Sequence, residues 1–417
     1  PDAPMSTPPY QVIVFGATSF VGQILCRYLI EQFGDHGTGT LQWAAAGRSQ
    51  AKLQALRDEL GPKAAKLALI VADAGDEAAR KNLCAQARAV ISAVGPYALF
   101  GEPLVKVCAE NGVDYCDLTG EVQWISRMIA RYEGAAKKSG ARIVHCCGFD
   151  SIPSDLGVLF LQREAQKRFG QPCTTVKMRV KAVAGAASGG TVASVINIVK
   201  EAAQDPALRK ELANPYSVCP PRHGFTAQQN EVRFAQFDPD FQAWITPFIM
   251  AGINTRIVHR SNALSKNAYG QQFHYDEATL TTTGFKGRLA AQGVAVATAS
   301  FMLALALPPT RWVMERFVVP KPGEGPSPAA QEKGFYDLRF FGRTDSGQAL
   351  RVKVTGDRDP GYGSTAKMLG QAGACLVQDI AQSDCPGGFW TPATIFGQRL
   401  ITRLQAKAGL TFEVLEG

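Results

Sequence analysis

The segment Gln11-Val-Ile-Val-Phe-Gly16-Ala-Thr-Ser-Phe-Val-Gly22 decides the fold of this chain. Residues 11–15 form an apolar run of the length of a buried strand, and the run ends at Gly16. Apolar side chains then recur every three or four residues from Val21 to Phe33, which predicts an amphipathic helix. A glycine-bearing turn between a strand and a helix is the context typical of a dinucleotide-binding βα unit.

The pattern of a strand followed by a helix repeats over about 150 residues. The later strands are expected at 41–46, 68–71, 89–94 and 142–146, and the helices between them at 50–60, 103–111 and 122–138. This alternation predicts an α/β fold with a doubly wound parallel sheet in a first domain, residues 1–152.

The pattern changes after Ser151. A helix at 154–169, an alternating strand at 175–184, a helix at 191–203 and an antiparallel hairpin at 335–342 and 349–355 predict a second, mixed α/β domain over residues 153–360. Residues 321–328 are rich in proline and glycine and read as a surface loop. Helices at 365–381 and 392–409, within residues 361–417, are expected to pack back on the first domain.

Composition places the chain among ordinary globular proteins. The 417 residues are 46% hydrophobic and carry a formal net charge of +8 without a block of five like charges, so no nucleic-acid partner is expected. Ten cysteines include no CxxC pair, which favours reduced thiols over a disulfide framework, and no metal site is predicted. The first ten residues lack the pattern of a secretory signal, and we expect a cytoplasmic protein.

Residues 289–307 form a stretch of 19 residues without a charge, rich in alanine. The length fits a membrane span, but small side chains enter lipid weakly and suit close contact between helices. We expect a helix that is buried in a homodimer interface or lines an apolar substrate tunnel. Contact with a membrane surface, with the protein partly membrane-associated, is the alternative.

The turn after the first strand is expected to hold a pyrophosphate, because amides at a helix start face outward there. The residues expected to bind it are Gly16, Ala17, Thr18, Ser19, Phe20, Val21 and Gly22. Ser19 stands where glycine is more usual, and its hydroxyl could add a phosphate contact.

The second strand ends in Gly47-Arg48-Ser49, with no acid nearby for a ribose hydroxyl. Arg48 and Ser49 are therefore expected to face a 2′-phosphate, so NADP is expected rather than NAD. Asp73, after the third strand, is expected either at the adenine or as a helix N-cap.

The fourth strand ends in Val94-Gly95-Pro96-Tyr97, where sheet geometry puts the nicotinamide half of the cofactor. Val94, Gly95, Pro96 and Tyr97 are thus added to the cofactor-binding residues. Tyr97 is also our first choice as proton donor or substrate contact.

Further catalytic candidates follow the next strands, namely Asp117, Glu121 and Asp150. Each has a structural alternative, and for Glu121 it is a place in the first turn of a helix. Tyr115, His145 and Ser151 lie in the same loops, where His145 suits a core position and Ser151 a helix cap.

The motifs together resemble the saccharopine dehydrogenase-like oxidoreductases, in the branch that includes the trans-acting enoyl reductases. The resemblance rests on GATSFVG (16–22), AGRS (46–49), ISAVGPY (91–97), YCDLTGE (115–121), HCCGFDSIPSDLG (145–157), SGGTVAS (188–194), KPGEGPS (321–327) and GGFWTPATIFGQRLITRL (387–404). It implies a Rossmann domain with a second α/β domain, an NADP-type cofactor and, in parts of the branch, a link to lipid synthesis or lipid-bearing membranes.

Three functions remain open at this point. The first is an NADP-dependent reductase that transfers hydride to an activated C=C or C=O bond of a lipid-like small molecule. The second is a saccharopine-type or imine-reducing amino-acid dehydrogenase, which would need arginines such as Arg179, Arg222 and Arg233 to converge on substrate carboxylates. The third is a non-catalytic NADP-binding scaffold.

Overall fold

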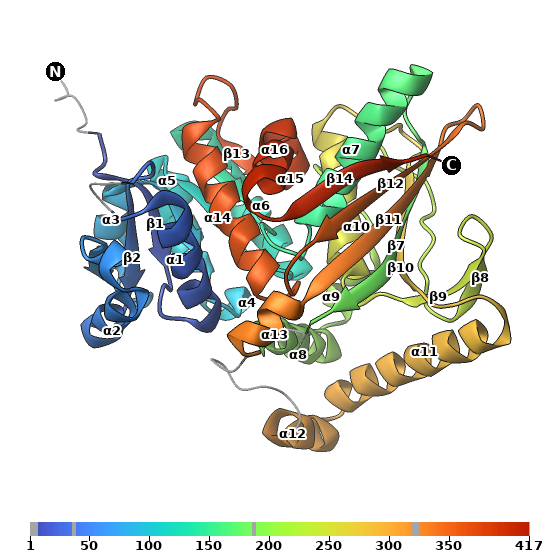
Figure 1. Ribbon diagram of the computed structural model, residues 1–417, viewed down its shortest axis with the longest axis horizontal. Coiled ribbons are helices and arrows are strands. Elements are labelled where there is room, and N and C mark those ends of the chain that lie inside the picture. The colour runs from blue at the N-terminus through green and yellow to red at the C-terminus, as the bar shows by residue number, and fades with distance from the viewer. Residues whose placement is uncertain (1–6, 36–38, 186–188, 318–324, 417) are drawn as a thin grey trace.

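The chain folds around two sheets, which Figure 1 shows side by side in a computed structural model. The structure describes residues 7–35, 39–185, 189–317 and 325–416. Most strands of the first sheet come from the blue, N-terminal part of the chain, whereas those of the second sheet run from green to red.

The first sheet contains seven strands that all pair in parallel. They are β1 (Tyr10–Phe15), β2 (Trp43–Gly47), β3 (Ala68–Val71), β4 (Ala87–Ser92), β5 (Asp114–Asp117), β6 (Arg142–Val144) and β13 (Gly388–Trp390). Their order across the sheet is β13-β6-β5-β4-β1-β2-β3. The carboxyl ends of β4, β5 and β6 therefore meet at one edge, where ligands of doubly wound sheets bind.

Helices cover both faces of this sheet because successive strand residues point to opposite sides. Val12 packs into one core with α1 (Phe20–Phe33), α2 (Gln50–Leu60) and α14 (Gly363–Gln378). Ile13 packs into the other core with α3 (Glu77–Ala85), α5 (Glu102–Asn111) and α6 (Val122–Ser139). The short helix α4 (Tyr97–Phe100) follows β4, and a 3₁₀ turn, η1 (Pro62–Ala64), follows α2.

The second sheet is mixed, since β7 and β10 pair in parallel and the other neighbours pair antiparallel. Its strands are β7 (Thr175–Ala184), β8 (Gln236–Asp238), β9 (Ala243–Pro247), β10 (His274–Leu280), β11 (Phe335–Arg343), β12 (Ala349–Gly356) and β14 (Leu410–Leu415), in the order β14-β12-β11-β7-β10-β9-β8. Helix α7 (Ile152–Phe169) packs on one face, where an added Cβ at Gly157 would lie only 2.4 Å from the Phe340 ring.

The remaining helices surround the second sheet and the junction. They are α8 (Gly189–Gln204), α9 (Pro206–Ala213), α10 (Ala251–Leu264), α11 (Gly284–Ala306), α12 (Pro308–Phe317), α13 (Pro328–Lys333), α15 (Pro392–Ile395) and α16 (Gln398–Lys407).

The predicted fold class, a doubly wound parallel sheet with a second mixed α/β unit, is confirmed. The final segment contributes to both sheets: β13 pairs with β6, whereas β14 pairs with β12. Strands β5, β8, β9, β10, β13 and β14 were not among the predicted elements. The loop expected at 321–328 lies partly outside the described residues.

Helix α11 contains the predicted apolar stretch, and the structure leaves most of it exposed. The helix is long and apolar enough to cross a membrane, with mean hydropathy 1.8 over an 18-residue window of which 11% is buried. The structure therefore does not bury α11 in the core of its own chain. Burial between two copies stays a prediction.

Candidate active site

The turn between β1 and α1 has the geometry of a dinucleotide-binding turn. Gly16 has φ of 83°, a conformation that residues with a Cβ rarely adopt. An added Cβ at Gly22 would lie 2.1 Å from the Gly16 carbonyl oxygen, so only glycine lets the first turn of α1 pack this closely. Ala17 is buried behind the turn.

Ser19 caps α1. Its hydroxyl oxygen accepts a hydrogen bond from the Gly22 amide at 3.1 Å and donates to the Ala93 carbonyl, also at 3.1 Å. The hydroxyl thus ties the turn to the end of β4, so its proton is not directed at a phosphate. The amides of Phe20 and Val21 occupy the first two helical positions, which have no acceptor within the helix and suit an anion.

Residues from the far end of the chain cover the outer side of this turn. The Phe20 ring meets the Tyr362 ring edge-on, with centroids 4.7 Å apart. Gly325 presses on the same ring, because an added Cβ there would lie 2.3 Å from the Phe20 Cε1 atom. Local sequence patterns gave no sign of this cover.

The end of β2 presents a cation. Arg48 is exposed directly after β2, and none of the described contacts uses its guanidinium. Ser49 caps α2 by accepting a hydrogen bond from the Lys52 amide at 3.3 Å. Together with the outward amides of α1, an exposed arginine in this place fits a dinucleotide with a 2′-phosphate.

Asp73 does not cap the next helix. Its carboxylate accepts a hydrogen bond from the Gly75 amide at 2.8 Å, which forms a local turn, and the cap of α3 is Asp76. The alternative of Asp73 as an N-cap is therefore wrong, while its place at the adenine stays a prediction.

The structure argues against Tyr97 as a proton donor. Its hydroxyl donates to the Ser92 carbonyl at 2.9 Å and accepts from the Leu118 amide at 3.2 Å. The ring is buried against Trp124, and burial raises the pKa of the hydroxyl well above its usual value. Tyr97 therefore joins the ends of β4 and β5, and the role we first expected for its hydroxyl is corrected.

Glu121 holds three segments together. Its carboxylate accepts hydrogen bonds from the amides of Tyr97 at 2.8 Å and Ala98 at 3.1 Å, and from the Ser194 hydroxyl at 3.0 Å. Burial raises the pKa of this carboxyl. Ser194 lies on α8, so Glu121 connects a helix of the second unit to the loops at the carboxyl ends of β4 and β5. Ligands of doubly wound sheets bind in the crevice outside these strand ends, and we call this place the crevice.

Asp117 is fully buried and accepts four hydrogen bonds. The donors are the Tyr115 hydroxyl at 3.0 Å, the amides of Thr119 and Cys146 at 3.1 and 3.3 Å, and the His145 ring at 2.7 Å between Nδ1 and Oδ2. This carboxyl group orders the loops after β5 and β6, and its four hydrogen bonds hold it in place.

Asp150 is half-buried as a residue, whereas Asp117 and Glu121 are buried. An added Cβ at Gly120 would lie 3.3 Å from the Asp150 Oδ1 atom, so the carboxyl packs directly against the loop after β5. Burial among protein groups, and secondly the charge of Asp117, raise the pKa of Asp150 to about 7. A carboxylic acid with this pKa can hold or release a proton near neutrality.

The second unit supports the loop that carries Asp150. The Ser151 hydroxyl donates to Asn254 Oδ1 at 3.1 Å instead of capping α7, and the Asn254 amide donates to Glu277 at 2.8 Å. The Tyr275 hydroxyl donates to the same carboxyl at 2.7 Å, and burial raises the pKa of Glu277 to about 7. Sequence reasoning missed Asn254 and Glu277, which come from α10 and β10.

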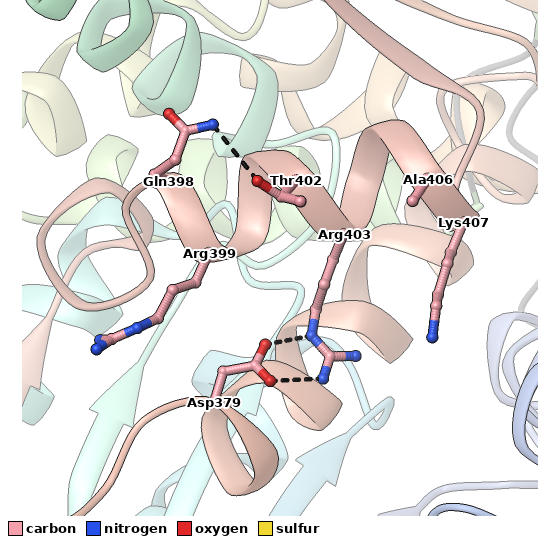
Figure 2. A pocket seen from close by; sticks show the side chains of 7 residues that line it. All are labelled: Asp379, Gln398, Arg399, Thr402, Arg403, Ala406 and Lys407. Atoms are coloured by element: carbon pink, nitrogen blue, oxygen red, sulfur yellow. Dashed lines mark hydrogen bonds and ion pairs between the residues drawn. The ribbon is translucent and has the colours of Figure 1, made fainter.

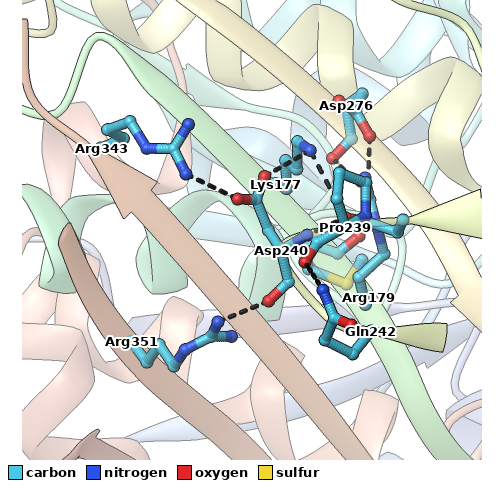
Figure 3. Close-up of polar contacts among 10 residues, drawn as sticks. Lys177, Arg179, Pro239, Asp240, Gln242, Asp276, Arg343 and Arg351 are labelled. Carbon is cyan, nitrogen blue, oxygen red and sulfur yellow. Dashed lines mark hydrogen bonds and ion pairs between the residues drawn. The ribbon is translucent and has the colours of Figure 1, made fainter. Parts of the chain in front are cut away.

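Two other polar clusters lie away from this crevice. A hollow of about 510 Å³ lies beside α16, and Figure 2 shows Arg403 of its lining paired with Asp379. Arg179 on the second sheet pairs with Asp276, as Figure 3 shows, and also with Asp238. Because its charge is neutralised there, Arg179 does not turn toward the crevice.

Comparisons with known proteins agree with this geometry. Residues 12–144 match the model of the saccharopine dehydrogenase NADP-binding domain. A protein of Mycobacterium tuberculosis (strain ATCC 25618 / H37Rv), assigned as a trans-acting enoyl reductase, is 38% identical over 414 residues that cover 97% of each chain. A trans-acting enoyl reductase of Mycobacterium bovis (strain BCG / Pasteur 1173P2) is 36% identical over 408 residues, with 95% of each chain covered.

A solved structure shares the fold. Saccharopine dehydrogenase (L-Glu forming) from Saccharomyces cerevisiae aligns with a TM-score of 0.54 over 98% of this chain and all of its own, at 14% identity. With the two mycobacterial relatives matched along nearly their whole length, the chain belongs to the saccharopine dehydrogenase-like family of NADP-binding oxidoreductases, in the branch that includes the trans-acting enoyl reductases.

Proposed function

We propose that the protein uses NADPH to reduce a C=C bond conjugated to a carbonyl in an apolar acyl substrate. The observation that carries this proposal is Asp150, whose carboxyl packs against Gly120 in the loop after β5 and whose pKa burial raises to about 7. The names of the mycobacterial relatives support the class of reaction.

The reduction needs one hydride and one proton. NADPH, when bound, supplies the hydride, and the cofactor-binding residues proposed for it are those of the β1–α1 turn, Arg48 with Ser49, Asp73 and the turn 94–97. The carbon next to the carbonyl must then receive the proton. We assign this proton to the Asp150 carboxyl, which burial and the nearby Asp117 keep partly protonated at neutral pH.

The other polar residues of the crevice position these groups. Glu121 holds the backbone of Tyr97 and Ala98, where the nicotinamide half of the cofactor is expected. Asp117 orders the loops after β5 and β6 and contributes the negative charge that opposes ionisation of Asp150. Asn254 fixes Ser151, the residue directly after the proposed acid.

Helix α8 supports an apolar substrate. It brings Ser194 to Glu121 and carries Val192, Val195 and Val199, which are all partly exposed. An apolar surface on the helix that contacts Glu121 suits an acyl chain better than an amino acid. Of the arginines that an amino-acid substrate would need, Arg179 is paired on the second sheet, and Arg233 pairs with Glu231.

The experiment is a substrate panel with the purified protein. NADPH oxidation is measured with enoyl thioesters of increasing chain length, with ketones and with imines. We expect turnover of long-chain enoyl thioesters that Asp150→Asn reduces on the order of 10²- to 10⁴-fold, the range for loss of a general acid. Preferential turnover of imines would favour the amino-acid dehydrogenase, and cofactor binding without turnover of any class would favour a scaffold.

We further propose a cytoplasmic location. All ten cysteines are free, and nine of them are buried, as expected for thiols in a reducing compartment. A homodimer stays a prediction, to be measured by light scattering.

A further inference from the structure

Helices α11 and α12, residues 284–317, form an arm that is apolar and largely uncovered. Figure 1 shows α11 standing off from the second sheet along the lower edge of the molecule, with α12 at its end. Val296 is 65% exposed, Leu303 61% and Trp312 61%. Single exposed apolar residues are common on protein surfaces, but a continuous exposed apolar segment indicates a binding surface. We call residues 284–317 the apolar arm.

The largest exposed apolar side chains of α11 lie along one face. Between residues 292 and 304 the structure buries no side chain, and Leu289, Val296 and Leu303 are 53%, 65% and 61% exposed. These positions are seven residues apart, so their side chains point in nearly the same direction around the helix. An apolar stripe of this kind suits a helix that lies in the plane of a lipid surface with one face buried in it.

Charges along the arm favour an anionic surface. Residues 278–314 contain no aspartate or glutamate, and cations stand at both ends of α11, with Lys286 and Arg288 before the apolar run and Arg311 after it. The aromatic residues Trp312 and Phe317 accompany the cations at the second end. Aromatic and basic residues at the borders of an apolar helix are typical of the lipid–water interface.

Both ends of the arm are tied to the body of the protein. At the first end, the Thr246 hydroxyl donates to the Ala291 carbonyl at 3.0 Å. At the second end, Lys200 of α8 pairs with Glu315 at 2.5 Å. A helix that crossed a bilayer would place its ends on opposite sides, so this attachment favours an orientation in the plane of the surface.

We propose that the apolar arm docks the protein on an anionic lipid surface, with α11 lying in the plane of that surface. Helix α8 links the arm to the crevice. Its Lys200 pairs with Glu315 of the arm, and its Ser194, less than two turns earlier, donates a hydrogen bond to Glu121. Docking would thus hold the crevice close to substrates dissolved in lipid. Substrate delivery rests on the proposed function, whereas docking does not.

The test is flotation of the purified protein with vesicles of phosphatidylcholine, with and without phosphatidylglycerol. We expect binding that is stronger to the anionic vesicles. The double variant Val296→Glu/Leu303→Glu should weaken binding about a hundredfold or more, because a carboxylate is costly in hydrocarbon. Arg311→Gln with Arg316→Gln should cost about fivefold for each cation removed.

The matched control is Phe234→Glu, which changes an exposed apolar residue outside the arm and should bind vesicles as the wild type does. Brominated lipids should quench tryptophan emission in the wild type but not in Trp312→Phe. NADPH binding by each variant shows that it is folded. Turnover of a water-soluble short-chain enoyl thioester tests the proposed reaction separately.

Wild-type protein that stays with the unbound fraction, or arm variants that bind anionic vesicles as tightly as the wild type, would overturn docking. A dimer that Val296→Glu/Leu303→Glu converts to a monomer, together with no vesicle binding, would assign the arm to contact between two copies.

Discussion

Replacement of Asp150 by asparagine should have opposite effects on activity and on stability, because it removes the proposed proton donor and also a carboxyl that is costly to ionise in the folded protein. The carboxyl has its pKa raised from 3.8 to about 7. A shift of roughly three pKa units raises the protonated fraction at pH 7 from about one in a thousand to about one half. The same shift corresponds to a cost of about 4 kcal/mol for ionising the group in the folded state.

The sign of the stability effect follows from proton linkage. The folded protein holds a proton on Asp150 at pH values where the unfolded chain has lost it, between about 4 and 7. The contribution of this group to stability is therefore fully present below pH 4 and is lost as the pH rises through 7. The uncharged asparagine avoids that loss, so Asp150→Asn should be more stable than the wild type at pH 8.

The assay combines steady-state kinetics and thermal unfolding across the pH range. We expect kcat of the wild type to fall above about pH 7, and the variant to lose activity on the order of 10²- to 10⁴-fold while its Tm at pH 8 increases. Asp58→Asn, at an exposed position on α2, is the control and should change neither. A variant with wild-type kcat, or one that is inactive because it unfolds, would refute the assignment.

Three other substitutions test the cofactor site by calorimetric titration and thermal unfolding. Arg48→Ala should weaken NADPH binding by about 1–3 kcal/mol and leave NADH nearly unchanged, and equal losses would show that Arg48 does not contact a 2′-phosphate. Gly95→Val should lose NADPH without loss of Tm, because an added Cβ meets only Tyr97 at 3.4 Å, and unchanged affinity would move the nicotinamide elsewhere. Gly22→Val should lower both affinity and Tm, since its Cβ would lie 2.1 Å from the Gly16 oxygen.

Local sequence patterns predicted those strands and helices that are defined by their own apolar residues and end signals. The strand predicted at 11–15 and the helix predicted at 50–60 follow from apolar runs and breaks, and the structure has them at 10–15 and 50–60. The cap of that helix, Ser49, was predicted only as a phosphate contact. Strand β5 was missed because two of its four residues are aspartates. Asp114 is buried there only through Arg142, 28 positions away, whose guanidinium and amide bond to it. No local pattern contains that pairing.

The sequence predicted where the candidate site residues lie, but it did not predict which of them could transfer a proton. Sheet geometry placed Tyr97, Asp117, Glu121 and Asp150 at one edge, and the structure brings them there. Their roles depend on tertiary hydrogen bonds. Ser92 and Leu118 occupy the Tyr97 hydroxyl, which leaves Asp150 as the candidate acid. Residue type alone could not reveal which hydroxyl or carboxyl was already engaged.

The proposed acid depends on both units of the fold. Asp150 ends the loop after β6 of the first sheet, and the next residue is tied through Asn254 to Glu277 on the second sheet. Glu277 itself is buried with a pKa raised to about 7, so its ionisation would strain the contacts that support the loop. The first sheet alone carries the β1–α1 turn, whereas the loop of the proposed acid also depends on contacts with the second sheet. A first domain expressed alone would keep the outward amides of α1 but lose the packing that sets the pKa of Asp150.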